Sequence, residues 1–255
     1  KVPASTETLC ELLSAYRYTA RPWTLDVVID RTQPRLVVSG RTAVAITSER
    51  VTMHAALEAE IGDSPLGSLR LRLPSGLRIA RVTLPPGADW FVSRRGDEMI
   101  LIVELEQPMI GKVLIELMGT LPRDADDPSF RVPVVSAAGA SAQIGQLAVV
   151  WDNDIDAHEQ DSAGARSIAP TELTGALKPL AAAPRLFAFQ YTKPPEGLSL
   201  RLSAADSQLA ATVVTTVSVR EGSLAYLTEI DFDIRGRSRS QLQFTTPDWL
   251  GADID

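Results

Sequence analysis

Alternation of apolar and polar residues at every second position is the feature that most constrains this chain. It is clearest in Leu69–Leu73 and Val213–Val219, and it recurs in Leu25–Ile29. Successive side chains of a β-strand point to opposite faces, so this period predicts strands with one buried face. Short turns rich in Pro and Gly separate these segments, which is typical of antiparallel sheets. We therefore predict an all-β chain of antiparallel β-sandwich units, with a super-sandwich as an alternative form.

Two nearly continuous apolar runs, Met99–Val103 and Lys112–Met118, flank a connection that contains Pro and Gly. Such runs are typical of strands buried on both faces, so we predict a central buried hairpin here. Helix is expected to be minor. It is limited to Thr6–Leu13 and Thr171–Leu180, where Thr before Glu offers a helix N-cap and an acidic first turn.

One segment of the sequence occurs twice in the chain. Ala15–Pro22 resembles Ala188–Pro195, and the two are 173 residues apart at every matched position. Extending the match without gaps gives twelve identities between residues 15–82 and their counterparts, where chance on average composition would give about four or five. Identical pairs include Leu36 with Leu209, Thr42 with Thr215, Val44 with Val217, Ile61 with Ile234 and Pro74 with Pro247. We interpret this as an internal duplication.

The duplication suggests how the chain is divided. Residues 1–184 are predicted to form a first β repeat unit, strand-rich over 15–150 and with a polar loop over 152–170. Residues 185–255 are predicted to be a shorter second copy. We expect the chain to be part of a longer array of repeats, or to contain a domain whose edges differ from those of the repeat.

The charge pattern, the hydropathy and the single cysteine limit what this chain can bind and where it can lie. The formal net charge is −7 and acidic and basic residues are interleaved, whereas a nucleic-acid surface needs a concentrated basic face. No run of eighteen apolar residues is present, so we predict no membrane span. The single cysteine, Cys10, lies in the apolar patch Leu9–Leu13 and is interpreted as a buried structural thiol.

One cluster has the spacing of a metal loop. Asp152, Asp154 and Asp156 alternate along the chain, as do the first oxygen ligands of a calcium-binding loop. The pattern then departs from such loops, because Ala157 stands where a glycine is usual and Ala163 stands where a bidentate Glu would close the shell. We keep calcium as the candidate cofactor, with a solvated acidic loop as the alternative.

The other ionisable clusters favour structural roles. Asp124–Asp127 lies between two prolines, which is typical of a turn. His54 falls in a strand-like stretch. His158 adjoins the acidic loop and could act as a base, but no nucleophile motif accompanies either histidine.

Some carboxylates recur at the repeat offset. Glu58 and Glu60 align with Asp231 and Asp233, which favours a solvated strand face over the facing pair of a glycosidase. The sequence has no phosphate-cradling Gly loop, zinc-ligand spacing or Gly-x-Ser-x-Gly elbow. We therefore predict no catalytic and no cofactor-binding residue.

Tyr18-Thr19 and Tyr191-Thr192 recur at the same offset, each followed by a proline. Exposed tyrosines could form a stacking platform for a sugar or peptide. The favoured interpretation is that each ring plugs the end of a β-sandwich while the proline directs the chain into the next strand.

The repeated strings resemble a known class of sequence. An aromatic-x-Tyr-x-x-x-Pro string, an alternating strand, Leu-x-Leu-x-x-Pro-x-x-Leu and then Gly145–Val149 are similar to repeated β segments of large, poorly characterised envelope or secreted proteins of high-GC Gram-negative bacteria. The resemblance covers most of the chain and implies a place in the cell envelope or outside the cell, but no activity and no functional residue.

From these features we predict a non-enzymatic interaction or scaffolding module of a larger protein, with a protein or glycan partner. The alternative is a carbohydrate-binding or accessory domain of a carbohydrate-active enzyme, by analogy of fold. A hydrolase with dispersed carboxylates is a third hypothesis.

Overall fold

The computed structural model describes residues 33–124, 127–206, 208–235 and 241–243, with Arg17, Thr19 and Thr24. The prediction of an all-β fold with minor helix is confirmed. The strands are β1 Arg35–Ile46, β2 Arg50–Leu73, β3 Arg78–Thr83, β4 Ala88–Arg95, β5 Glu98–Pro122, β6 Ser129–Arg131, β7 Ser136–Ala137, β8 Ala142–Trp151, β9 Ile155–Asp161, β10 Arg166–Ser167, β11 Leu186–Tyr191, β12 Ser199–Ala204, β13 Gln208–Arg220 and β14 Ser223–Arg235. Two 3₁₀ helices, η1 Pro170–Glu172 and η2 Gly175–Ala182, occupy the second predicted helical segment. The first, Thr6–Leu13, lies outside the described residues.

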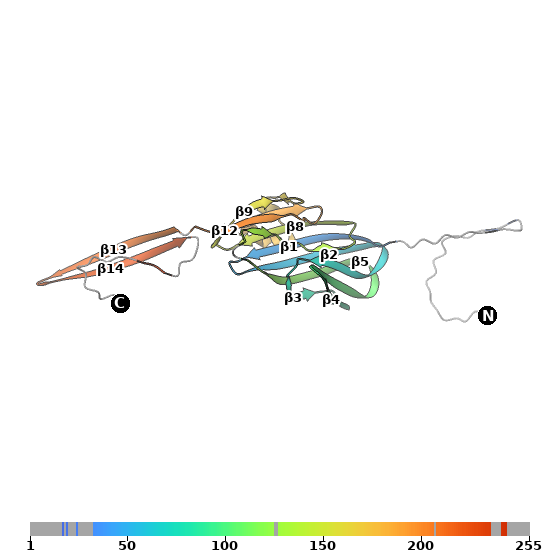
Figure 1. Ribbon diagram of the computed structural model, residues 1–255, viewed down its shortest axis with the longest axis horizontal. Helices are drawn as coiled ribbons and strands as arrows, with labels where there is room; N and C mark the ends of the chain where they lie inside the picture. Colours follow the sequence, from blue (N-terminus) through green and yellow to red (C-terminus); the bar gives the residue numbers. More distant parts are fainter. Residues whose placement is uncertain are drawn as a thin grey trace. The chain divides into compact units, whose positions relative to one another are not determined.

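The larger of two packed sheets has the order β10-β11-β8-β1-β2-β5-β3, with β4 added on β5 and β7 on β2. Its central strands lie side by side in Figure 1. A second sheet has the order β6-β12-β9. The pairings within both sheets are antiparallel except for β1 with β8, which is parallel.

The two sheets share one core, which gives the sandwich-like arrangement. The larger sheet contributes alternating residues such as Val44, Leu57 and Ile115, and the smaller sheet contributes Ile155 and Leu200. On the opposite face of β8 and β11, a smaller cluster of Ala148, Ile168, Leu173, Leu177 and Ala188 lies under the 3₁₀ helices. Each fully buried aliphatic side chain contributes about 1.5–3 kcal/mol, so the face that alternation predicted is the face that stabilises the fold.

The predicted central hairpin is wrong. Met99–Val103 and Lys112–Met118 lie on one strand, β5, whose alternate residues are buried on a single face. Between them the pairing of β2 with β5 shifts register after Ile61 and again after Leu66. Asp63 and Gly111 have positive φ values of 64° and 118° at this irregularity. Two long strands therefore bend together where we expected the chain to turn back.

The boundaries also differ from those predicted. The stretch 152–170, expected as a polar loop, contains β9 and β10, because Ile155 and Ala157 alternate into the core. The expected boundary at 184/185 falls inside the sandwich: β11 pairs with β8, and β12 pairs with β6 and β9. By its contacts the chain instead divides between Thr32 and Gln33.

The last two strands form a separate two-stranded sheet, β13 with β14. Their pairing runs from Gln208↔Arg235 to Val219↔Leu224 and Arg220↔Ser223. That of β1 with β2 runs from Arg35↔Gly62 to Ile46↔Val51. Both members of a β13–β14 pair lie 173 residues after the members of a β1–β2 pair, so the two hairpins have the same register at the offset found in the sequence.

Among the described residues, no helix is long and apolar enough to cross a bilayer.

Candidate functional site

An open groove of about 740 Å³ lies beside the short strand β7. The charged side chains that line it are Arg72, Arg131, Lys193 and Glu196, so cations outnumber carboxylates. Arg72 is engaged by a neighbour, since its Nε lies 3.1 Å from Oε1 of Glu98 in an exposed ion pair. The groove therefore has a mixed polar and apolar lining, whose charges are mainly positive.

A buried amide shapes the wall of this groove. Gln143 is only 5% exposed. Its Nε2 donates to the carbonyl of Val135 and its Oε1 accepts from the backbone N–H of Ala137, both at 2.8 Å. Because both ends of a buried amide must be satisfied, this side chain fixes the irregular backbone from Val135 to Ala137. We assign it a structural role.

The hydroxyl of Tyr191 lies against the paired backbones of β1 and β8, at Gly40 and Gly145. A Cβ added to Gly40 would lie 2.8 Å from this oxygen, and one added to Gly145 would also meet it. Tyr191 is 2% exposed, so the face of its ring cannot stack on a ligand. The interpretation as a plug of the sandwich end stays a prediction. Burial raises the pKa of Tyr191. Tyr18 lies outside the described residues.

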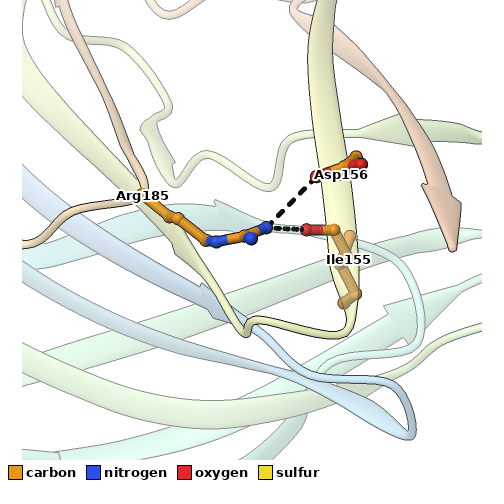
Figure 2. Close-up of polar contacts among 3 residues, drawn as sticks. All are labelled: Ile155, Asp156 and Arg185. Atoms are coloured by element: carbon orange, nitrogen blue, oxygen red, sulfur yellow. Dashed lines mark hydrogen bonds and ion pairs between the residues drawn. The ribbon is translucent and has the colours of Figure 1, made fainter. Parts of the chain in front are cut away.

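The predicted calcium residues flank the turn from β8 to β9. Asp152 and Asp154 lie in the turn, and Asp156 lies on β9. Figure 2 shows Arg185 reaching this region: its Nη1 donates to the carbonyl of Ile155 and to Oδ1 of Asp156, the latter at 3.2 Å. A guanidinium therefore already occupies one side of Asp156. The part of the chain that the structure describes contains no group of three His, Cys, Asp or Glu side chains arranged to hold a metal. Calcium stays a prediction.

The remaining candidates are separate from one another. The carboxylate of Asp127 accepts from the backbone N–H of Ser129 at 2.8 Å, as in an Asp turn, while Asp126 and Cys10 lie outside the described residues. His54 is half-buried on β2, and His158 is exposed on β9.

The carboxylates that repeat at the offset lie on strand faces. Glu58 accepts from Lys112 Nζ at 2.6 Å across the β2–β5 pair, and this contact lowers the pKa of Glu58 and raises that of Lys112. Glu60, Asp231 and Asp233 are exposed on their strands. Glu58 thus takes part in a cross-strand ion pair, as expected for a solvated face.

Sequence reasoning missed the groove because its lining comes from residues around 72, 131–143 and 192–196. Only the polar Gln143 within the apolar strand β8 could have drawn attention to it.

Comparison with known proteins gives a limited likeness. No family model and no curated protein matches the chain. Among solved structures, yeast LTA4 hydrolase is similar over 69% of this chain and 30% of its own, with 9% identity and a TM-score of 0.44. The M1 zinc metallopeptidase from Deinococcus radiodurans is similar over 77% of this chain and 47% of its own, with 12% identity and a TM-score of 0.37. A two-domain M1 zinc metallopeptidase bound to L-tryptophan is similar over 78% of this chain and 48% of its own, with 12% identity and a TM-score of 0.38. The chain spans less than half of these proteins, and a likeness this weak says nothing about its activity.

Proposed function

We propose that this chain is a non-enzymatic β-sandwich module of a larger protein, with a role in interaction or scaffolding. The observation that carries the proposal is that β13 and β14 pair in the register of β1 and β2, 173 residues later. Tandem copies of one folding unit are typical of extended scaffolds, in which each unit contacts its neighbours. This correspondence supports a repeating module.

The groove beside β7 is the surface that we assign to a partner. Arg131 and Lys193 line it together with Val132–Val134. Exposed cations near an irregular backbone favour an acidic partner segment, because complementary charge speeds encounter and orients the bound partner.

A second candidate is the carbohydrate-binding or accessory domain. It is favoured by two exposed aromatic side chains on the edge strand β4: Trp90 is 37% exposed and Phe91 is 46% exposed. They lie on opposite faces of the strand, so each ring offers a separate stacking surface. Exposed aromatic rings combine an apolar face with a polar edge, which suits the flat faces of sugars.

We place the larger protein in the cell envelope or outside the cell, and this rests on the resemblance of the repeated strings alone. Fractionation of the source cells, with an antibody against the chain, tests the location. Recovery of the protein in the cytosolic fraction only would contradict it.

The function is tested by capture. The full chain is immobilised and exposed to an envelope extract, and retained proteins and glycans are identified by mass spectrometry. A variant with Arg131→Glu and Lys193→Glu reverses the charge of the groove. Arg94→Glu, on exposed β4, is the matched control.

Retention of one acidic protein by the wild type and the Arg94 variant, but not by the groove variant, is the expected result. Retention of a glycan, lost when Trp90 and Phe91 are replaced by Ala, would favour the second candidate. Turnover of peptide or glycoside substrates by the purified full chain would overturn the non-enzymatic assignment.

A further inference from the structure

The hairpin β13–β14 has one apolar face, made by its cross-strand partners. Its members occupy alternate positions on both strands: Leu209, Ala211, Val213, Thr215, Val217 and Val219 on β13, and Leu224, Tyr226, Thr228, Ile230, Phe232 and Ile234 on β14. We call this set the hairpin face. Val217 is 49% exposed and Leu224 is 57% exposed. Apart from the central Thr215–Thr228 pair, this face is apolar. An exposed apolar face of this extent is typical of a surface that another element covers.

The equivalent face of β1–β2 shows what covers such a surface. Val44 and Val51, the counterparts of Val217 and Leu224, are both 0% exposed. In that hairpin, β8 pairs in parallel with β1, and β5 pairs antiparallel with β2. The smaller sheet then closes the core over the face, through residues such as Leu200. Within the described residues, β13 and β14 pair only with each other.

We infer that β13–β14 is the opening hairpin of a second sandwich, and that its hairpin face and edges receive the strands of a further copy of the repeat unit. This inference rests on the proposed modular role. The occupant adds a strand of β8 type in parallel along β13 and a strand of β5 type antiparallel along β14. Open strand edges are templates for such pairing, and an isolated two-stranded hairpin is marginally stable without it.

The chemistry of the occupant follows from the first sandwich. Val113, Ile115 and Leu117 alternate into the core from β5, and Leu147 and Val149 do so from β8. Strands with this alternation would meet the hairpin face with aliphatic side chains.

One position must differ between the two sandwiches. Gly40 lies under the Tyr191 hydroxyl, where an added Cβ would be only 2.8 Å from the oxygen. Its counterpart in the second hairpin is Val213. The occupant of the hairpin face therefore leaves room at this point for a valine side chain, and a cover copied from the first sandwich would clash here.

The first test uses the full chain with single substitutions on opposite faces of β13. Val217→Glu places a charge on the hairpin face, whereas Thr216→Glu places one on the other face of the same strand. Binding of a fluorescent dye that reports exposed apolar surface is measured for both. We expect Val217→Glu to lose dye binding and Thr216→Glu to keep it, and equal effects would overturn the inference.

The second test supplies the missing strands. A fusion protein is made in which residues 1–247 are followed by residues 75–206. The junction follows Pro247 because it is the counterpart of Pro74. The fusion also carries Val213→Gly, which removes the expected clash. A reference chain, residues 1–207 followed by residues 35–206, carries an unaltered copy of β1–β2. Hydrogen exchange of the β13–β14 amides is compared with that of β1–β2 in each molecule.

The expected result is that the hairpin amides, rapidly exchanging in the parent chain, become as protected as those of β1–β2. Unprotected amides in the fusion, with a protected second hairpin in the reference, would overturn the inference. So would a dimer of the parent chain in sedimentation that Val217→Glu dissociates, because a second copy would then be the occupant. If the second β1–β2 hairpin of the reference chain is also unprotected, the dye binding of Val217→Glu and Thr216→Glu decides whether the inference stands. None of these measurements depends on capture or turnover, so failure of the proposed function is distinguishable.

Discussion

The hairpins β1–β2 and β13–β14 have the same register and the same apolar alternation, yet opposite environments. Val44 of β1 is fully buried, whereas Val217, its counterpart on β13, is about half exposed. The first hairpin has β8 and β5 on its edges and the smaller sheet over its face. The difference shows that local sequence determines which residues pair, while burial depends on strands that come from far along the chain.

The difference in burial implies a difference in hydrophobic stabilisation between the two hairpins. Hydrophobic stabilisation is proportional to the apolar area removed from water, about 25 cal/mol per Å². Leu57 on β2 contributes in full because it is 1% exposed. The corresponding residue of β14, Ile230, keeps part of its surface in water. Equivalent substitutions in the two hairpins should therefore have unequal costs.

The largest difference in the free energy of unfolding is expected between substitutions of Leu57 and of its counterpart Ile230. Leu57→Ala leaves a cavity in the shared core and should lower the free energy of unfolding by about 2–5 kcal/mol. Ile230→Ala should lower it by less, about 1 kcal/mol, because this side chain is only partly buried. Urea denaturation of the sandwich followed by circular dichroism measures both. Equal losses would mean that the hairpin face is covered in solution, and would contradict the difference in burial between the two hairpins.

Much of the fold could be predicted, because alternation is a local property. Leu69–Leu73 and Val213–Val219 lie on strands as expected. The error at β5 arose because Pro108 and Gly111 suit a bulge as well as a turn, and only the pairing with β2 distinguishes the two. Strand β9 was missed because just two of its residues, Ile155 and Ala157, enter the core.

A second prediction concerns the position at which the hairpins differ. Gly40→Ala should lower the free energy of unfolding by about 1–3 kcal/mol, because its Cβ would be forced against the Tyr191 hydroxyl. Adding Tyr191→Phe removes that oxygen and should restore part of the loss. Val213→Ala, at the counterpart position, should have little effect. Thermal denaturation of the four proteins tests this, and a silent Gly40→Ala would contradict the packing described.

The candidate site was less predictable than the fold, since it depends on tertiary contacts. Arg72, Arg131 and Lys193 are far apart in sequence, and only the folded sheets bring them to one groove. The acidic loop was visible as Asp152, Asp154 and Asp156, but its partner Arg185 was not, because nothing local relates the two.

A smaller effect is expected in the smaller sheet, which has no counterpart over β13–β14 among the described residues. Arg185 ties β9 to the segment before β11, through an ion pair with Asp156 that is partly exposed. Asp156→Asn should therefore cost at most about 1 kcal/mol. If the loop binds calcium, Arg185→Gln should increase the rise in melting temperature with calcium, because the guanidinium no longer competes for Asp156. The absence of any calcium-dependent rise, in the wild type and in this variant, would exclude the site.

The smallest effect concerns a contact of β2 with β5. Among the described residues, no strand pairs with β14 in the way that β5 pairs with β2. The pKa of Glu58 is lowered by Lys112, so this carboxylate contributes stability above its unfolded pKa and loses it as the pH falls through the folded value. The pKa of Lys112 is raised, so its contribution is full below its unfolded pKa and is lost as the pH rises through the folded value. Lys112→Met should raise the Glu58 pKa measured by NMR titration, whereas Lys178→Met, on exposed η2, should not. An unchanged Glu58 pKa in the Lys112 variant would show that the pair is open in solution, and that β2 gains only backbone pairing and apolar packing from β5.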